Sequence, residues 1–292
     1  MTTQPDLLCP VCGHTALPLF YAGDQRMFRC SDCHLAFVYP TPSDAFLSDF
    51  YSRFHRMLEE GGGYEMREDR MSADFPAKLA KIGRYAALSD IELLDVGCGK
   101  GFFVKACAER QITAKGIDLS DTAVAYARQT LGVSAFQGRI EDCARELGPF
   151  DVVTCWATIE HLPDPARTLK SIYSVLKPGG LLFLDTGIGF DWLDRLLPGM
   201  NQWYDPPQHL FVFSAAAMHL TIQDAGLIVE DFDACFERNR IRRLARMWRG
   251  YVAAFGLRAV SELTRSTGSG PFLFTRFPLG NLMSVVCRKP DL

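Results

Sequence analysis

The sequence lacks the features that would carry a chain into or across a membrane. Its first residues, MTTQPDLLCP, contain neither the basic segment nor the apolar segment of a secretory signal. No apolar run approaches the roughly 18 residues that a bilayer crossing needs. We therefore expect a cytoplasmic protein, whose cysteines are thiols or metal ligands rather than disulfides.

Strong charge and low complexity are also absent. The net charge is −3, which gives no general attraction to nucleic acid, and there is no internal repeat or low-complexity tract. Hydrophobic residues make up 48% and charged residues 22%, as in ordinary globular proteins. A chain of 292 residues is long enough for one large α/β domain with a smaller appendage.

The ten cysteines are not spaced like a disulfide framework, but four of them form two C-x-x-C pairs. Cys9 pairs with Cys12 and Cys30 with Cys33, and this spacing predicts a zinc ribbon over residues 1–40. Four thiolates close the coordination sphere, so the zinc is expected to be structural. The alternatives are four ordinary buried cysteines or a redox pair, and a redox pair would need a neighbouring βαβ unit.

Residues 41–90 read as a helical linker or lid. Apolar residues recur on one side of 45–60, three glycines at 61–63 break the pattern, and a second amphipathic run covers 73–88.

From residue 91 onward, strand-like and helix-like segments alternate, which predicts a doubly wound α/β sheet with helices on both faces. The expected strands are 91–96, 113–117, 133–136, 150–155, 180–185, 227–235 and 281–288. The expected helices are 101–110, 121–131, 141–147 and 164–176.

A glycine-rich turn, ELLDVGCGKGFF, follows the first of these strands. Lys100 precedes Gly101 rather than Ser or Thr, which excludes a P-loop. The acid at Asp95 stands where a pyrophosphate would arrive, so the turn suits a cationic amino group better than a dinucleotide. Asp118, at the end of the next strand, can accept hydrogen bonds from both ribose hydroxyls. The expected ligand is a nucleoside that carries an amino acid.

These segments resemble the class I S-adenosylmethionine-dependent methyltransferases from about residue 75 to the C-terminus. The similar motifs are LLDVGCGKG, GIDLS, FQGRIEDC, FDVVTCWATIEHLPDP, VLKPGGLLFLD and DPPQHLFVFSAAAMHLTIQDAGL. The resemblance implies a Rossmann-like seven-stranded sheet and an enzyme that transfers a methyl group from S-adenosylmethionine. With its four-cysteine module, the chain is similar to a bacterial group of small-molecule biosynthetic methyltransferases.

The resemblance also implies roles for individual residues. Asp95 lies near the amino group of the cofactor, Asp118 holds the ribose and Leu119 packs on the adenine. The Ile140 amide meets the adenine edge, with Glu141 or Asp142 near the adenine amine, because Arg139 replaces the acid that many members carry. The rest of the implied cofactor site comprises the glycine-turn residues Gly97, Cys98, Gly99 and Gly101, and Trp156 beside the methionine part. Cys98 itself reads as a small filler between glycines.

An oxygen acceptor must lose its proton as the methyl group arrives, and histidine is the usual base. Of six histidines, His161 and His209 are expected at the carboxyl ends of strands. His161 lies in EHLPDP, which occurs in members with different acceptors, and it is expected to brace that loop or to act as the base. His209 is expected to be the base or an acceptor ligand, the alternative being a loop histidine bonded to backbone. Trp203 and Tyr204 either line the acceptor pocket or pack the loop.

Residues 237–280 form an insertion, and 238–255 combine an apolar stripe with several arginines. We expect an amphipathic helix that docks on the core or caps the acceptor pocket, or else one that contacts an anionic acceptor or a membrane surface.

Three functions remain open at this point. The first is methylation of a small biosynthetic acceptor, most readily at oxygen. The second is RNA methylation in which the ribbon binds RNA. However, the ribbon contains Asp6, Asp24 and Asp32 as well as Arg26 and Arg29, so it offers no basic face. The third is a non-catalytic S-adenosylmethionine-binding protein.

Overall fold

The structure is a computed structural model. It describes residues 7–22, 25–43, 45–47, 49–50, 63–190, 201, 203–234 and 281–291. The expected insertion at 237–280, the segment 238–255 within it, and most of the expected helix 45–60 lie outside these described residues.

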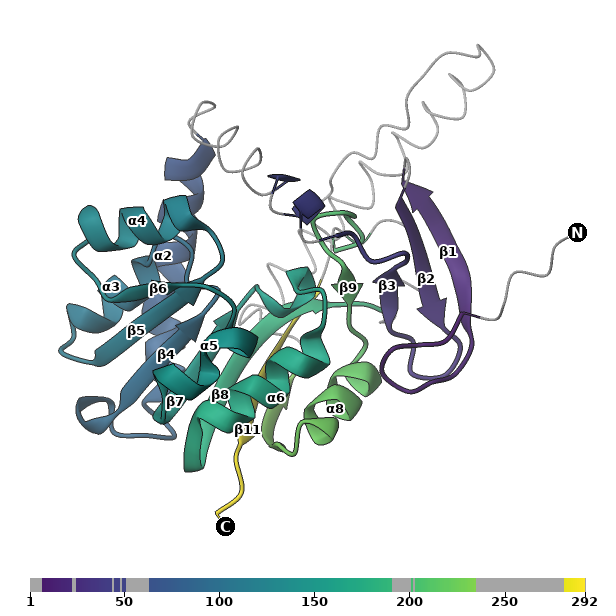
Figure 1. Ribbon diagram of the computed structural model, residues 1–292. Coiled ribbons are helices and arrows are strands. Elements are labelled where there is room, and N and C mark those ends of the chain that lie inside the picture. The colour runs from purple at the N-terminus through teal and green to yellow at the C-terminus, as the bar shows by residue number, and fades with distance from the viewer. Residues whose placement is uncertain are drawn as a thin grey trace, which may run out of the picture.

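A seven-stranded sheet forms the centre of the molecule, in the order β10-β11-β8-β7-β4-β5-β6 (Figure 1). Its strands are β4 (Glu92–Val96), β5 (Thr113–Asp118), β6 (Ala135–Gln137), β7 (Phe150–Trp156), β8 (Leu176–Ile188), β10 (Ile228–Asp233) and β11 (Asn281–Arg288). Strand β11 is antiparallel to both of its neighbours, whereas the pairs from β8 to β6 are parallel. The predicted Rossmann-like class is confirmed.

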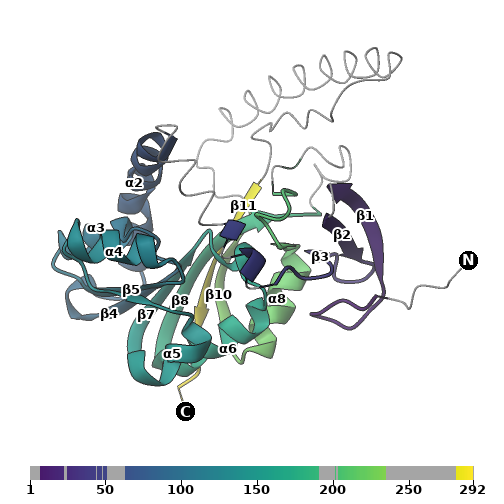
Figure 2. The ribbon, with the colours of Figure 1, turned by 45° about the horizontal axis from the view of Figure 1, so that its top comes forward.

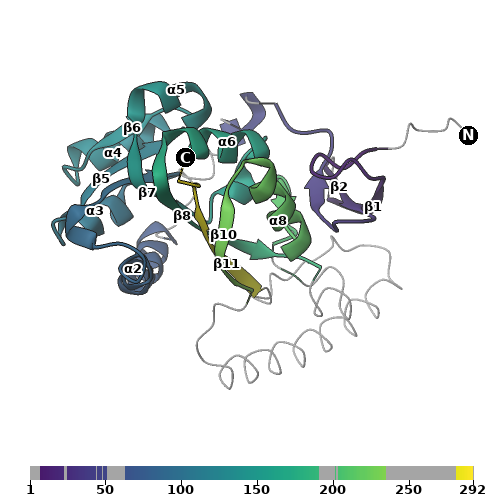
Figure 3. The same ribbon diagram turned by 90° about the horizontal axis from the view of Figure 1, so that it is seen from below.

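Helices cover both faces of this sheet, which is seen from below in Figure 3. They are α2 (Gly63–Ile82), α3 (Phe102–Ala108), α4 (Asp121–Gln129), α5 (Ile140–Leu147), α6 (Pro165–Val175) and α8 (Ala215–Asp224), with short 3₁₀ turns η1 (Leu88–Asp90) and η2 (Ile159–His161). Helices α2 and α3 contact each other on one face, and α5, α6 and α8 form a row on the other.

The alternation of side chains along the strands explains this layering. On β4, buried Leu93 packs with the cluster that contains Phe75 and Leu79 of α2, and its neighbour Leu94 packs with the cluster that contains Leu169 of α6. Both faces of the central strands are therefore apolar, which is the pattern of a parallel sheet covered by helices on both sides.

The N-terminal module forms a second sheet of order β1-β2-β3-β9, at the right of Figure 2. Three of its strands, β1 (Ala16–Ala22), β2 (Gln25–Cys30) and β3 (Ala36–Val38), come from the module. The fourth, β9 (Phe211–Val212), belongs to the segment that follows His209 and pairs antiparallel with β3. The module thus completes its sheet with a strand supplied from more than 170 positions later in the sequence.

Two elements differ in extent from the sequence-based expectations. Helix α2 begins at Gly63 and ends at Ile82, although the apolar pattern indicated 73–88. Strand β8 runs from Leu176 to Ile188, longer than the expected 180–185, because Leu176 pairs with Phe150 of β7 at one end and 186–188 pair with β11 at the other.

Candidate functional site

The glycine turn after β4 adopts left-handed backbone. Gly97, Gly99 and Gly101 have φ values of +75°, +51° and +81°, a region that costs other residues roughly 1–2 kcal/mol. A β-carbon at Gly97 would stand 2.4 Å from the side chain of Thr158, so this glycine is required by packing. At Gly99 nothing lies within 4 Å of the added atom, so its backbone faces open space. A ligand can therefore approach the chain closely at Gly99.

Cys98 packs inside this turn. Its side chain is buried, and its sulfur would lie 2.5 Å from a β-carbon added at Gly116 on β5. Burial raises the pKa of the thiol, which disfavours the reactive thiolate. This environment agrees with the predicted role of a small filler.

Asp118 ends β5 and is held rigidly. One carboxylate oxygen accepts the N–H of Gly99 at 2.8 Å, and the other accepts the N–H of Ser120 at 2.8 Å. A carboxylate oxygen has two lone pairs and can accept more than one hydrogen bond. The residue that the sequence predicts to hold a ribose is thus preorganised beside the glycine turn, on the neighbouring parallel strand.

Asp95 lies at the carboxyl end of β4 and is 3% exposed. Its carboxylate accepts a 2.6 Å hydrogen bond from the hydroxyl of Thr154 on β7. Burial raises the pKa of Asp95 to about 7, against the opposing effects of the Thr154 hydrogen bond and the nearby Lys78 charge. A buried carboxyl of this kind becomes anionic readily when a cation binds next to it.

Trp156 ends β7 and carries a lysine on its ring. The Lys78 ammonium, from α2, lies 4.3 Å from the ring centroid and 3.1 Å from a carboxylate oxygen of Asp185 on β8. The other oxygen of Asp185 accepts the N–H of Ala157 at 2.7 Å. Cationic, anionic and aromatic groups therefore meet at the carboxyl edge of β4, β7 and β8, and this edge binds ligands in open α/β sheets.

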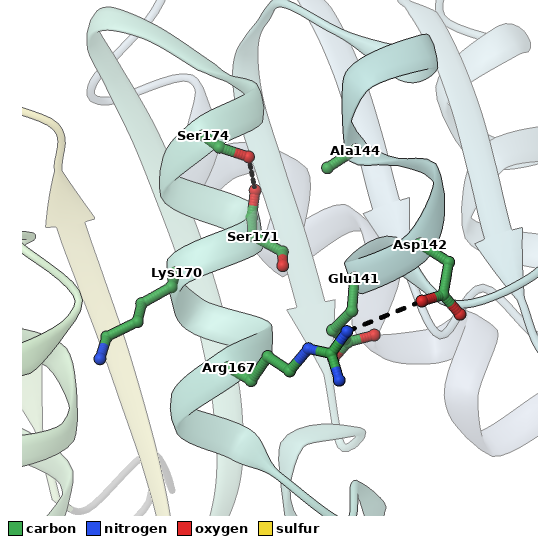
Figure 4. A pocket seen from close by; sticks show the side chains of 7 residues that line it. All are labelled: Glu141, Asp142, Ala144, Arg167, Lys170, Ser171 and Ser174. Carbon is green, nitrogen blue, oxygen red and sulfur yellow. Dashed lines mark hydrogen bonds and ion pairs between the residues drawn. The ribbon is translucent and has the colours of Figure 1, made fainter.

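The predicted adenine side is assembled less completely. Leu119 is 46% exposed, which suits an apolar residue that awaits a planar ligand. Ile140 begins α5 and is buried. The Glu141 carboxylate, however, accepts the hydroxyl of Thr168 on α6, and Asp142 lies 3.8 Å from Arg167. Figure 4 shows these acids in a groove between α5 and α6.

His161 and His209 lie side by side, with ring centroids 4.9 Å apart. Nδ1 of His161 is 2.6 Å from the Gln208 carbonyl, and Nδ1 of His209 is 2.9 Å from the Trp203 carbonyl. A carbonyl oxygen only accepts, so each Nδ1 carries a hydrogen, and in the neutral ring Nε2 is then the acceptor.

The buried carboxyl of Glu160 faces the two histidines. One of its oxygens accepts the hydroxyl of Thr186 at 2.8 Å, and the other lies 3.9 Å from Nε2 of His161. Within the described residues this second oxygen is buried and meets no hydrogen-bond donor. The three ligand atoms of Glu160, His161 and His209 lie within 4.8 Å of one another. Three acceptors that converge in this way can hold a proton or a divalent cation.

The four cysteines of the two C-x-x-C pairs converge although they come from distant positions. Their sulfurs lie within 4.8 Å of one another, with Cys9 to Cys33 at 3.6 Å and Cys12 to Cys30 at 3.3 Å. A zinc tetrahedron with bonds of about 2.3 Å would place its sulfurs about 3.8 Å apart. The N–H groups of Val11 and Asp32 point at Sγ of Cys9 and Cys30, each at 3.4 Å. The donor set therefore fits a closed four-thiolate metal site.

Sequence reasoning missed three polar residues at the carboxyl edge of the large sheet. They are Lys78, Glu160 and Asp185, each at most 13% exposed at the side chain. Lys78 had a detectable signal, because it falls on the apolar face of α2 between buried Phe75 and Ile82. Glu160 stands directly before a candidate histidine, but sequence alone gives no measure of its burial.

Fold and site together define an α/β enzyme that binds a nucleoside cofactor at the carboxyl edge of a Rossmann-like sheet. Residues 64–231 match the family model of a methyltransferase domain, and this range is more than half of the chain. The chain belongs to this family and is an S-adenosylmethionine-dependent methyltransferase.

Its curated relatives include two proteins named ubiquinone biosynthesis O-methyltransferase. The one from Xanthomonas campestris pv. campestris (strain B100) is 34% identical over 199 residues, which cover 61% of this chain and 81% of the relative. The one from Pseudomonas aeruginosa (strain LESB58) is 35% identical over 176 residues, which cover 53% and 72%.

Solved structures agree on the fold. A Bacillus halodurans C-125 protein described as a methyltransferase matches with a TM-score of 0.50 at 23% identity, covering 73% of this chain and 99% of its own. The [4+2]-cyclase SpnF also matches with a TM-score of 0.50, at 20% identity, covering 77% and 81%. Because a cyclase shares the fold, the reaction must be argued from the site. In the described residues, no helix combines the length and apolarity that a membrane crossing requires.

Proposed function

We propose that the protein transfers a methyl group from S-adenosylmethionine to a hydroxyl of a small biosynthetic acceptor. The observation that carries this proposal is the group of Glu160, His161 and His209, which Thr186 of β8 joins to the carboxyl edge of the sheet. Two curated relatives named as O-methyltransferases support oxygen as the target. The RNA alternative gains no support from these relatives.

In this proposal the cofactor lies across the ends of β4 and β5. Asp118 binds the ribose hydroxyls, Leu119 and the Ile140 amide contact the adenine, and the backbone at Gly97–Gly99 lies against the methionine part. Glu141 is engaged by Thr168, so Asp142 remains the candidate acceptor for the adenine amine.

The methionine part is a zwitterion and needs a partner for each charge. Asp95 is proposed to bind its ammonium, and the ammonium of Lys78 its carboxylate, after giving up part of its contact with Asp185. The face of Trp156 is proposed to stabilise the positive sulfonium. Because all three side chains are at least partly buried, their interactions with the cofactor are less screened by water than surface contacts would be.

For methyl transfer, Nε2 of His209 takes the hydroxyl proton while the acceptor oxygen attacks the methyl carbon. The new O–CH₃ bond forms as the S–CH₃ bond breaks, and the electron pair of the broken bond stays on sulfur as S-adenosylhomocysteine leaves. A positioned base contributes typically about 10²–10⁴-fold. The buried Glu160 carboxyl, whose pKa is raised by burial, stabilises the imidazolium that forms next to it.

We further propose that the four cysteines hold one structural zinc ion. With four thiolate ligands the metal has no open position, so it supplies stability and no chemistry. The proposed division is residues 1–40 as the ribbon, 41–90 as a helical linker or lid, and 91–292 as the methyltransferase domain. The ribbon sheet nevertheless includes β9 of that domain.

The test is turnover. Purified protein is mixed with S-adenosylmethionine and a panel of catechols and phenols, and both S-adenosylhomocysteine and the mass of the methylated acceptor are measured. We expect product that depends on an acceptor with a free hydroxyl. Product formed from RNA, or from acceptors in which every hydroxyl is replaced by hydrogen, would contradict the proposal.

A further inference from the structure

Among the side chains of the four-cysteine module, Arg29 on β2 contacts the turn that carries Tyr204 and His209. We propose that Arg29 is a positioning residue for His209, so that the module helps to build the acceptor site. This inference rests on the proposed function, because it assumes that His209 accepts the proton.

Arg29 contacts two aromatic residues of the methyltransferase domain. Its Nη2 donates a 2.6 Å hydrogen bond to the hydroxyl of Tyr204. The carbon at the centre of its guanidinium lies 5.5 Å from the Tyr204 ring centroid and 5.2 Å from that of Phe190. A planar guanidinium can both stack on rings and donate a directed hydrogen bond, and lysine cannot do both. Arg29 therefore fixes where Tyr204 lies.

Tyr204 belongs to the turn that orients His209. The preceding residue, Trp203, supplies the carbonyl that accepts Nδ1–H of His209, and its ring centroid lies 5.3 Å from the His209 ring. The N–H of His209 also donates to the carbonyl of Asp205 at 3.0 Å. A shift of Tyr204 thus moves its neighbours Trp203 and Asp205, whose carbonyls accept the imidazole Nδ1–H and the backbone N–H of His209, respectively.

The turn rests on the sheet at its other side. Trp203 packs so closely on Gly187 of β8 that an added β-carbon would stand 2.0 Å from its ring. The amide of Asn201 donates to the Ile188 carbonyl at 2.9 Å, and its side-chain oxygen accepts the N–H of Trp203 at 3.0 Å. Strand β8 supports the turn from the domain, and Arg29 supports it from the module.

The chemical consequence concerns the His209 tautomer. With Nδ1–H bonded to the Trp203 carbonyl, Nε2 is the acceptor that a base needs. If the turn relaxes, this hydrogen bond lengthens and the neutral ring divides between two tautomers. Only one of them can take a proton at Nε2.

The module has other attachments, which allow a clean test. Strand β3 pairs with β9, and the Ser214 hydroxyl donates to the Cys33 carbonyl at 2.5 Å. The ring of His34 stacks on Phe190, with centroids 3.6 Å apart. Removal of the Arg29 guanidinium therefore leaves the module attached while it removes the hydrogen bond to Tyr204.

The experiment measures the His209 ring by ¹⁵N NMR on histidine-labelled protein, with no acceptor present. The signals are assigned by comparison with His209→Ala. In the wild type, at pH values where the ring is neutral, we expect a single tautomer with its hydrogen on Nδ1. Arg29→Met is expected to give a mixture of tautomers, with unchanged bound metal and unchanged S-adenosylmethionine affinity. Arg26→Met is the matched control, because it removes the same charge from an exposed position on the same strand.

Tyr204→Phe is the second variant, and it keeps the ring and the module intact while it removes the hydrogen-bond acceptor. We expect a mixture of His209 tautomers in Tyr204→Phe as well, and this variant tests the proposal even if Arg29→Met does not fold. A single tautomer in Tyr204→Phe, or an equal disturbance in Arg26→Met, overturns the proposal. With an active acceptor, kcat of Arg29→Met should fall by up to about 10²-fold at unchanged KM for S-adenosylmethionine. If wild-type protein methylates no hydroxyl, the proposed function fails, and the tautomer result still decides whether Arg29 positions the ring.

Discussion

The hydroxyl of Thr154 on β7 donates a 2.6 Å hydrogen bond to the carboxyl of Asp95 on β4, and both side chains are buried. This pair joins the two strands at the topological switch point of the parallel sheet, where β5 follows on one side of β4 and β7 lies on the other. The buried carboxyl is the group proposed to meet the cofactor ammonium.

The first prediction is that cofactor affinity depends on pH through Asp95. Burial raises the pKa of this carboxyl to about 7 in the free protein, and the cationic ligand binds the ionised form. Affinity is therefore full above pH 7 and falls by up to about tenfold per pH unit below it. Calorimetry between pH 6 and 8 measures this slope. Asp95→Asn should bind weakly and without the slope, and a persistent slope in that variant would assign the effect to another group.

The raised pKa of Asp95 also makes the free energy of unfolding depend on pH when no ligand is bound. The folded protein holds the Asp95 proton more tightly than the unfolded chain does, so the stability that this group contributes is present at low pH. It is lost as pH rises from the ordinary value near 3.8 through about 7. When the cofactor binds, its ammonium group is proposed to pair with the ionised Asp95 carboxylate and so to offset this loss of stability.

The second prediction concerns Asp118. Asp118→Ala removes the acceptor for the N–H groups of Gly99 and Ser120, and the proposed acceptor for the ribose hydroxyls. We expect S-adenosylmethionine binding to weaken by roughly 1.5–3 kcal/mol, the range for hydrogen bonds to a charged group. Calorimetry measures it, and Asp121→Ala, on the exposed first turn of α4, is the control. Unchanged affinity in Asp118→Ala would remove the residue from the cofactor site.

The third prediction compares two glycines of one turn. Gly97→Ala adds a β-carbon 2.4 Å from Thr158 at a φ of +75°, so it should destabilise the fold and distort the turn. Gly99→Ala meets no atom within 4 Å and should cost only the roughly 1–2 kcal/mol of the left-handed backbone. Denaturant unfolding should therefore rank Gly97→Ala as clearly less stable. If both variants unfold alike, the contact with Thr158 does not constrain the turn.

The fourth prediction is that His209→Ala loses about 10²–10⁴-fold in kcat and keeps nearly wild-type affinity for S-adenosylmethionine. The reason is that Nε2 of His209 is proposed to take the acceptor proton, whereas the proposed cofactor contacts lie elsewhere. His219→Ala on α8 is the control, because that ring packs on Phe232 away from the site. A variant close to wild type in turnover would transfer the role to His161, and lost cofactor affinity would place His209 on the cofactor side. Turnover measured after treatment with a chelator distinguishes whether Glu160, His161 and His209 hold a proton or a divalent cation.

The fifth prediction is one tightly bound zinc ion per chain. The four convergent sulfurs of Cys9, Cys12, Cys30 and Cys33 provide a complete tetrahedral set. Metal analysis should find one equivalent in the wild type and none in Cys30→Ser. Cys143→Ser, at a half-buried cysteine of α5, should keep the metal. Wild-type protein that is purified without chelator and contains no metal would contradict the assignment.

Much of the fold could be predicted because its signals are local. Continuous apolar residues before the glycine turn specify β4, and the change to a helical period specifies α3. The two C-x-x-C pairs predicted the cysteine cluster from spacing alone. Strands β7 and β11 were expected within a residue of where they lie.

What could not be predicted depends on contacts distant in sequence. Nothing local shows that β3 pairs with β9, since a two-residue strand carries no periodicity. Lys78 falls on the apolar face of α2, but its contact with the Trp156 ring depends on how α2 packs over the sheet. Glu160 is an ordinary acid of a conventional motif until β8 brings Thr186 to one oxygen and burial isolates the other.

The pairing of β3 with β9 has a consequence for biosynthesis. During translation the cysteines emerge first and can gather their metal early, but the outer edge of β3 has no strand beside it until residues 211–212 have left the ribosome. An uncovered edge is a template for pairing with other chains. The long interval between the two strands therefore makes the nascent N-terminal module the part of this protein most exposed to misassembly, and its maturation must await the last third of the chain.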